Sequence, residues 1–122
     1  MVLVDTSVWV DHWRRGNDEL AALAEEDRIV VHPMIIGELA LGALRSRAEV
    51  LGDLRDLRAA SMAEHEEVLE LVERHKLWGR GIGWVDAHLL ASSLLDDVKL
   101  WTMDKHLGRV AKDLGTLWAS AR

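Results

Sequence analysis

The chain has 122 residues, 49% of them hydrophobic, and a formal net charge of -6 at pH 7. This length and apolar content predict a single folded domain with a buried core. The absence of cysteine excludes disulfides, thiolate zinc sites and cysteine nucleophiles, and the acidic balance argues against a protein that coats nucleic acid by bulk attraction to phosphate. No basic start precedes an apolar signal segment and no apolar run is long enough to span a bilayer, so we expect a cytoplasmic protein without a membrane segment.

Short apolar segments alternate with amphipathic segments along the chain. The apolar segments predict strands at 2–4, 28–32 and 98–103, a weaker strand near 59–62 and a last short strand near 116–119. The amphipathic segments predict helices over about 7–13, 17–24, 33–45, 48–55, 64–78, 84–95 and 105–114. Pro33, the only proline, suits the first turn of its helix. This alternation is typical of an α/β fold, in which helices cover both faces of a parallel sheet.

Two acidic residues follow predicted strands directly. Asp5 follows the apolar run 2–4, and Asp104 follows the strand 98–103. Functional sites in open parallel sheets form outside the carboxyl ends of the strands, so these two carboxylates would meet if their strands are neighbours. Taken alone, Asp5 is more simply explained as a cap for the helix that begins after it.

Two further acidic residues stand out against apolar helices. Glu38 interrupts the helix 33–45, which is otherwise apolar around nearly its whole circumference, so we expect its carboxylate to be half-buried. An ion pair with Arg45 explains Glu38 as well as a functional role does. Asp86 heads the inward stripe of the helix 84–95, although a favourable charge in the first turn is the simpler explanation for it.

The four acids have a common chemical implication if they converge. At a separation of about 4 Å and an effective dielectric constant near 20, each pair of bare carboxylates costs about 4 kcal/mol, so a cation must lie among them. Oxygen ligands without His or Cys suit Mg²⁺ or Mn²⁺ better than zinc. Such an ion lowers the pKa of a bound water and neutralises charge on a leaving oxygen, and no nucleophilic side chain is then required.

Four stretches in this order resemble a known family. They are VDTSVWVD at the start, Glu38 within PMIIGELALGAL, Asp86 before its apolar helix, and LWTMDKHL near the end. Together they resemble the PIN domain, and more closely the VapC-type toxins of bacterial type II toxin–antitoxin pairs. The resemblance covers essentially the whole chain, 1–122, as one PIN domain. It implies a five-stranded parallel sheet flanked by helices and metal-dependent endonucleolytic cleavage of RNA.

The resemblance also implies roles for particular residues. The positions that match the family's acidic, Mg²⁺- or Mn²⁺-binding catalytic site are Asp5, Glu38, Asp86 and Asp104. Thr6 and Thr102 match hydroxyl positions that support this site. One position departs from the family pattern, because Leu107 stands where a Phe is common after the His that follows the last acid.

The resemblance implies partners as well as substrate. A VapC-type toxin is restrained by a VapB-type antitoxin whose tail lies across the acidic site, and we expect a homodimer on the same grounds. Electrostatics suggests that an Arg or Lys of the tail takes the place of the metal, since a cation is favoured among clustered carboxylates. The apolar surface of the early helices, with Trp9 and Trp13, is a candidate surface for the tail or for a second copy.

Other classes of protein share part of this pattern. Aspartyl phosphatases and phosphotransferases also place an Asp after the first strand and use Mg²⁺, but they resemble a pattern with a second acid two residues later, where this chain has Ser7. A receiver-like signalling domain needs a phosphoacceptor Asp after a middle strand, and the segment 59–63 contains none. An inactive interaction module with the PIN fold is the third alternative, which a complete set of four acids makes the least attractive.

Overall fold

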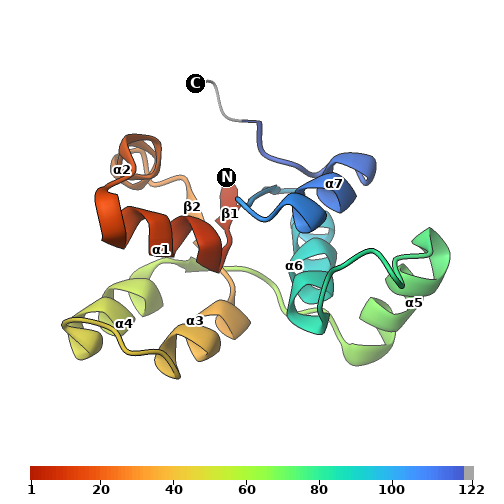
Figure 1. Cartoon of the computed structure of the whole chain (residues 1–122), viewed down its shortest axis with the longest axis horizontal. Coiled ribbons are helices and arrows are strands. Elements are labelled where there is room, and N and C mark those ends of the chain that lie inside the picture. Colours follow the sequence, from red (N-terminus) through yellow and green to blue (C-terminus); the bar gives the residue numbers. More distant parts are fainter. Residues whose placement is uncertain (120–122) are drawn as a thin grey trace.

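The computed structural model describes residues 1–119, which form one parallel sheet with helices around it (Figure 1). The strands are β1 (Val2–Val4), β2 (Ile29–Val31), β3 (Arg58–Ala59) and β4 (Lys99–Trp101). The helices are α1 (Thr6–Arg15), α2 (Asp18–Glu25), α3 (Pro33–Ala40), α4 (Arg47–Asp56), α5 (His65–His75), α6 (Trp84–Leu95) and α7 (Lys105–Asp113). In Figure 1, α1 to α4 lie on the left of the molecule and α5 to α7 on the right. No helix within the described range is long and apolar enough to span a membrane.

The sheet has the order β3-β2-β1-β4, and every pair of strands is parallel. The predicted α/β fold is confirmed, and β1 is the neighbour of β4, with Leu3 beside Leu100. Val2, Leu3 and Val4 are all fully buried. A continuous apolar run of this kind is expected of a strand covered on both faces, and each such side chain contributes about 1.5–3 kcal/mol by its burial.

The predicted fifth strand is wrong for the part of the chain that the structure describes. Near residue 117 there is one bridge to β4, in which the N–H of Leu100 donates to Thr116 (2.7 Å) and that of Trp118 donates to Leu100 (2.8 Å). The ladder stops there because β4 ends at Trp101, and the N–H groups of Met103 and Asp104 donate to side-chain hydroxyls instead of to a further strand. The last residues of the segment predicted at 116–119 adjoin 120–122, which lie outside the described residues.

Two predicted helices are shorter in the structure, and one strand is shifted. The helix expected over 33–45 ends at Ala40, whose carbonyl accepts from the Arg47 guanidinium (2.7 Å). Ser46, at φ 50°, then turns the chain into α4. The helix expected to reach residue 78 ends before Lys76, which has a positive φ of 53°. The strand expected near 59–62 begins at Arg58 instead.

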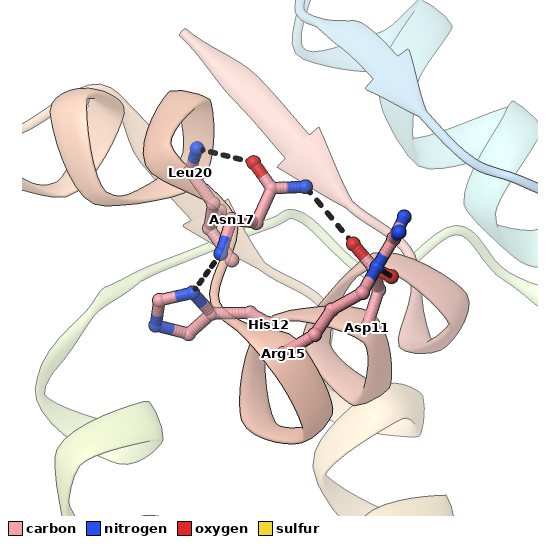
Figure 2. Close-up of polar contacts among 5 residues, drawn as sticks. All are labelled: Asp11, His12, Arg15, Asn17 and Leu20. Atoms are coloured by element: carbon pink, nitrogen blue, oxygen red, sulfur yellow. Dashed lines mark hydrogen bonds and ion pairs between the residues drawn. The ribbon is translucent and has the colours of Figure 1, made fainter.

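Side-chain hydrogen bonds fix the corner between α1 and α2 (Figure 2). The Asn17 side chain accepts from the N–H of Leu20 (3.0 Å) and so caps α2. The backbone N–H of Asn17 donates to Nδ1 of His12 (3.1 Å). Asp11 accepts from Arg15 and from Asn17. The hydrogen bond from Arg15 is the main cause that holds the pKa of Asp11 below its usual value. Asp11 therefore stabilises the corner between α1 and α2 and is the sixth residue of α1, beyond the residues that directly follow β1.

Candidate active site

The neighbouring strands β1 and β4 bring Asp5 and residues 101–104 together at the carboxyl edge of the sheet. Asp5 follows β1 directly, and its N–H donates to the carbonyl of Trp101 at the end of β4 (2.9 Å). Asp104 lies three residues beyond Trp101, at the start of α7. Because parallel strands present their carboxyl ends at the same edge, both acids lie at the edge where sites form in this class of sheet.

The Asp5 carboxylate is buried and held by hydroxyl groups. Its side chain is 8% exposed, and Oδ2 accepts from Ser7 Oγ (2.8 Å) and from Thr102 Oγ1 (2.7 Å). Asp5 is the N-cap of α1 by position, but its side chain makes no capping hydrogen bond with the described backbone of that helix. Capping therefore does not explain this carboxylate. Within residues 1–119 its other oxygen, Oδ1, has no hydrogen-bond partner.

Ser7 and Thr102 tie the end of β1 to the loop after β4. Thr102 Oγ1 donates to Asp5 and accepts from the N–H of Asp104 (3.0 Å). Ser7 Oγ also donates to Asp5 and accepts from the N–H of Met103 (3.0 Å). Each hydroxyl is thus fixed by two partners, and both orient Asp5. The sequence analysis considered Ser7 as the position where aspartyl phosphatases carry a second acid, and it did not predict that this hydroxyl binds Asp5.

Glu38 reaches the site from α3. The Thr6 hydroxyl donates to its Oε1 over a long distance of 3.4 Å. Partial burial raises the pKa of Glu38, and the charges of Asp5 and Asp86 raise it further, against the hydrogen bond from Thr6. Glu38 is more exposed than the sequence predicted, and it lies at the rim of a groove, two residues before α3 ends. Within the described chain it forms no ion pair with Arg45, which lines the same groove.

Asp86 and Asp104 each accept a hydrogen bond at the start of a helix, and their charges also act on the acidic group. Asp86 lies in the first turn of α6, where Oδ2 accepts from the N–H of Gly83 (3.0 Å). Burial raises its pKa, and the charges of Asp5 and Asp104 raise it further. Asp104 caps α7, since Oδ1 accepts from the N–H of Leu107 (2.9 Å). The helix-terminus explanation therefore holds for Asp86, and Asp104 also caps a helix, which the sequence analysis did not predict; Asp86 in addition carries the repulsion of two other acids.

The four carboxylates are close enough to act on one another's charge. Glu38 is affected by Asp5 and Asp86, and Asp86 by Asp5 and Asp104. Within residues 1–119, however, no three acidic or histidine side chains lie close enough to hold one ion without rearrangement. The donor set consists of oxygen atoms alone, and two of its members have raised pKa values, so the residues fit a hard divalent cation that would relieve this repulsion.

The raised pKa of Asp86 predicts a gain in stability when its charge is removed. A carboxylate whose pKa is raised in the folded state destabilises that state above this pKa, and the cost disappears as the group takes up a proton at lower pH. We expect Asp86→Asn, measured without divalent ions at neutral pH, to raise the melting temperature by about 2–5 °C. The gain should shrink on acidification. Asp53→Asn, exposed on α4, is the matched control, and a lower melting temperature for Asp86→Asn would contradict the repulsion.

We compared the sequence and the fold with those of known proteins. Residues 2–113 match the family model described as PIN domain. The chain is 45% identical over 120 residues to Ribonuclease VapC32 from two strains of Mycobacterium tuberculosis, covering 98% of this chain and 97% of the relative. The chain therefore belongs to the PIN-domain family. At this identity and coverage it is, within that family, a homologue of a VapC ribonuclease, and the resemblance predicted from the sequence is confirmed.

Two solved structures share the fold. The crystal structure of PAE2754 from Pyrobaculum aerophilum matches with a TM-score of 0.64 and 16% identity, covering 88% of this chain and 82% of the other. The crystal structure of FitAcB from Neisseria gonorrhoeae matches with a TM-score of 0.62 and 18% identity, covering 92% of this chain and 94% of the other. At these identities the two matches bear on the fold alone.

Proposed function

We propose that this chain is a divalent-metal-dependent endoribonuclease and the toxin of a VapBC-type pair. The observation that carries the proposal is the group of four carboxylates at the carboxyl edge of the sheet, in which the charges of neighbouring acids help to raise the pKa values of Glu38 and Asp86. The group belongs to a chain 45% identical to Ribonuclease VapC32 over nearly its full length. Such a group can hold a divalent ion that activates water as the attacking species, and hydrolysis of a phosphodiester then needs no nucleophilic side chain.

The chain's own residues have distinct parts in this reaction. We assign Asp5 and Asp86 as the principal ligands, because Asp5 keeps Oδ1 without a partner in the described chain and Asp86 carries repulsion that a cation would relieve. A bound Mg²⁺ or Mn²⁺ supplies a water of lowered pKa and neutralises charge on the phosphodiester. Glu38, with its raised pKa and exposed position, accepts the proton of the attacking water. Asp104 completes the oxygen set, with Oδ1 held by α7.

The hydroxyl side chains keep this arrangement in place. Ser7 and Thr102 both donate to Oδ2 of Asp5, so the carboxylate cannot rotate freely. Thr6 donates to Glu38 over 3.4 Å, which is a weak restraint that leaves the general base mobile. Hydrogen bonds from neighbouring groups to metal-binding carboxylates commonly change metal affinity or activity by about 10–100-fold.

A groove beside Glu38 suits a restraining partner. It encloses about 850 Å³ between α1, α3 and α4, and Trp13 and Arg45 are among the side chains that line it. Trp13 is 37% exposed and stacks on Trp9, with ring centroids 5.8 Å apart. Trp9 itself is only 8% exposed, so it supports the groove without forming its surface. We infer that a VapB-type antitoxin tail lies in this groove and directs a basic side chain toward Glu38.

The homodimer stays a prediction that rests on the resemblance. Leu94 (42% exposed) and Leu95 (53%) end α6, and Met62 (49%) follows Ser61, whose N–H donates to Asp96 just beyond that helix. These would gain from burial against a second copy. A sedimentation measurement of the purified chain decides between monomer and dimer.

The phosphatase alternative lacks its second acid. Position 7 carries a hydroxyl that donates to Asp5 instead of a carboxylate that would protonate a leaving group. The Ser7 hydroxyl is also held by the N–H of Met103. Nuclease chemistry, in which water attacks a phosphodiester, uses all four acids and is the function that the site supports best.

The proposed function is tested by cleavage of RNA with and without divalent ions. The purified chain is incubated with total bacterial RNA in Mg²⁺, in Mn²⁺ and in excess EDTA, and new 5′ ends are mapped by sequencing. We expect cuts at a limited set of positions in either metal and none in EDTA. Undiminished cleavage in EDTA would overturn metal catalysis, and intact RNA in every condition would overturn the nuclease assignment.

A further inference from the structure

A fully buried hydrogen bond joins α6 to the residue in front of α3. His32 follows β2 and is the N-cap of α3, and Ser92 lies in the middle of α6. Both side chains are 0% exposed, and Nε2 of His32 lies 2.9 Å from Oγ of Ser92 across 60 residues of sequence. Within residues 1–119 it is the one side-chain hydrogen bond that joins α3 or its cap to α6.

The contacts of His32 define how its ring is protonated. Nδ1 accepts from the N–H of Met34 (3.0 Å), the second residue of α3, so it carries no proton. Nε2–H must then donate to Ser92 Oγ. Burial lowers the pKa of His32 to about 4, so the ring is neutral at physiological pH. One neutral ring therefore caps α3 and at the same time binds α6.

The two helices joined in this way each carry one acid of the site. Glu38 lies six residues beyond His32 along α3, and Asp86 lies six residues before Ser92 along α6. At 1.5 Å per residue, each acid is about 9 Å along its helix from the hydrogen bond. A tilt of about 5° at the hydrogen bond would move either carboxylate by about 0.8 Å, and displacements near 1 Å can cost about a hundredfold in rate.

We propose that His32 and Ser92 are positioning residues, whose buried hydrogen bond between α3 and α6 sets the distance from Glu38 to Asp86. The role rests on the proposed metal-dependent cleavage of RNA. Neither residue touches the reacting atoms. Their effect is carried by two helices, which the hydrogen bond prevents from tilting apart.

Three single variants, and the double variant that combines Ser92→Ala with His32→Asn, separate an effect on the position of the acids from an effect on the stability of the fold. Ser92→Ala removes the acceptor and leaves the cap of α3 intact. His32→Asn keeps an oxygen that can accept from the N–H of Met34, but its side chain is too short to reach Ser92. Ser93→Ala is the matched control, because Ser93 is an equally buried neighbour whose hydroxyl bonds to Leu90 and Thr116, away from α3.

We expect Ser92→Ala and His32→Asn to lower kcat by about 10–100-fold and to change KM for RNA by less than about threefold. Binding of Mn²⁺ without RNA, measured by calorimetry, should weaken about tenfold in the same variants. The double variant should lose no more than either single variant, because both remove one hydrogen bond. Ser93→Ala should lower the melting temperature by a similar amount and keep wild-type kcat and Mn²⁺ affinity.

Other outcomes overturn the role. Wild-type kcat and Mn²⁺ affinity in Ser92→Ala would refute it, and so would losses in Ser93→Ala as large as those in Ser92→Ala. If the wild-type protein cleaves RNA in Mg²⁺ and Ser92→Ala cleaves it at the same rate, the positioning role is refuted and the proposed nuclease function stands. If wild type cleaves no RNA, the proposed function fails, and the Mn²⁺ affinities of the three variants still decide whether the hydrogen bond positions the acids.

Discussion

Replacing Asp5 by Asn is expected to lower the rate of divalent-dependent RNA cleavage by more than about a hundredfold and to leave the fold intact. An Asn oxygen can accept the hydrogen bonds from Ser7 and Thr102 that Oδ2 now accepts. Its amide NH₂ then stands where Oδ1 was, and this group has no lone pair to offer a cation. The variant thus removes a ligand and a charge and keeps the hydroxyl partners.

The measurement is initial cleavage rate against Mg²⁺ concentration, with the melting temperature as a check on folding. Asp11→Asn is the matched control, because Asp11 lies in the same opening stretch but bonds to Arg15 and Asn17 at the corner of α1 and α2 (Figure 2). The control should lose some stability and keep the wild-type cleavage rate. Full activity of Asp5→Asn would show that the reaction does not depend on this carboxylate.

Adding a cognate VapB-type antitoxin, as proposed above, is expected to stop RNA cleavage at an equimolar ratio. A basic side chain of its tail is favoured among carboxylates that repel one another, for the reason that a metal ion is. The two cations then compete, so raising the Mg²⁺ concentration should raise the amount of antitoxin needed for half inhibition. The assay measures cleavage and antitoxin binding in parallel over a series of Mg²⁺ concentrations.

Trp13→Ala tests whether the groove holds the tail. Trp13 lines the groove beside Glu38, and exposed aromatic residues of this kind are frequent hot spots of binding. We expect antitoxin affinity to fall by about tenfold or more with this variant, with Trp78→Ala, which is 58% exposed outside the groove, as the control. Tight binding with unchanged cleavage would refute inhibition at the acidic site, and an absence of binding would put the toxin assignment itself in question.

Local sequence patterns were sufficient for most of the fold. The apolar run 2–4 and the strand before Asp104 predicted a parallel sheet, and their adjacency is confirmed. Pro33 marks the first turn of its helix as predicted. These features depend on a few consecutive residues. The fifth strand failed because the pairing of residues 116–118 depends on where β4 stops, and beyond that point the N–H groups donate to side-chain hydroxyls, one of them on Ser7 at the other end of the sequence.

The details of the candidate site depended on contacts that spacing cannot show. Thr102 donates to Asp5 across 97 residues, and Ser7 accepts from Met103 across 96. Glu38 lies two residues before the end of α3, and the Arg47 guanidinium binds the last carbonyl of this helix from beyond it. The chemical type of the site could therefore be predicted from four acids, whereas their hydrogen-bond partners and burial required the folded chain.

The pairing of β1 with β4 also has a consequence for how the protein is made. Asp5 leaves the ribosome early, but the hydroxyl of Thr102 and the neighbouring strand that hold it are synthesised near the end. Contacts between such distant parts of a chain form late, because closing a long loop costs entropy before any contact repays it. A product terminated before residue 99 lacks β4 and Asp104, and so lacks the complete acidic group. Because β4 and Asp104 come late in the sequence, such truncated fragments cannot form the complete acidic site, whether or not an antitoxin is bound.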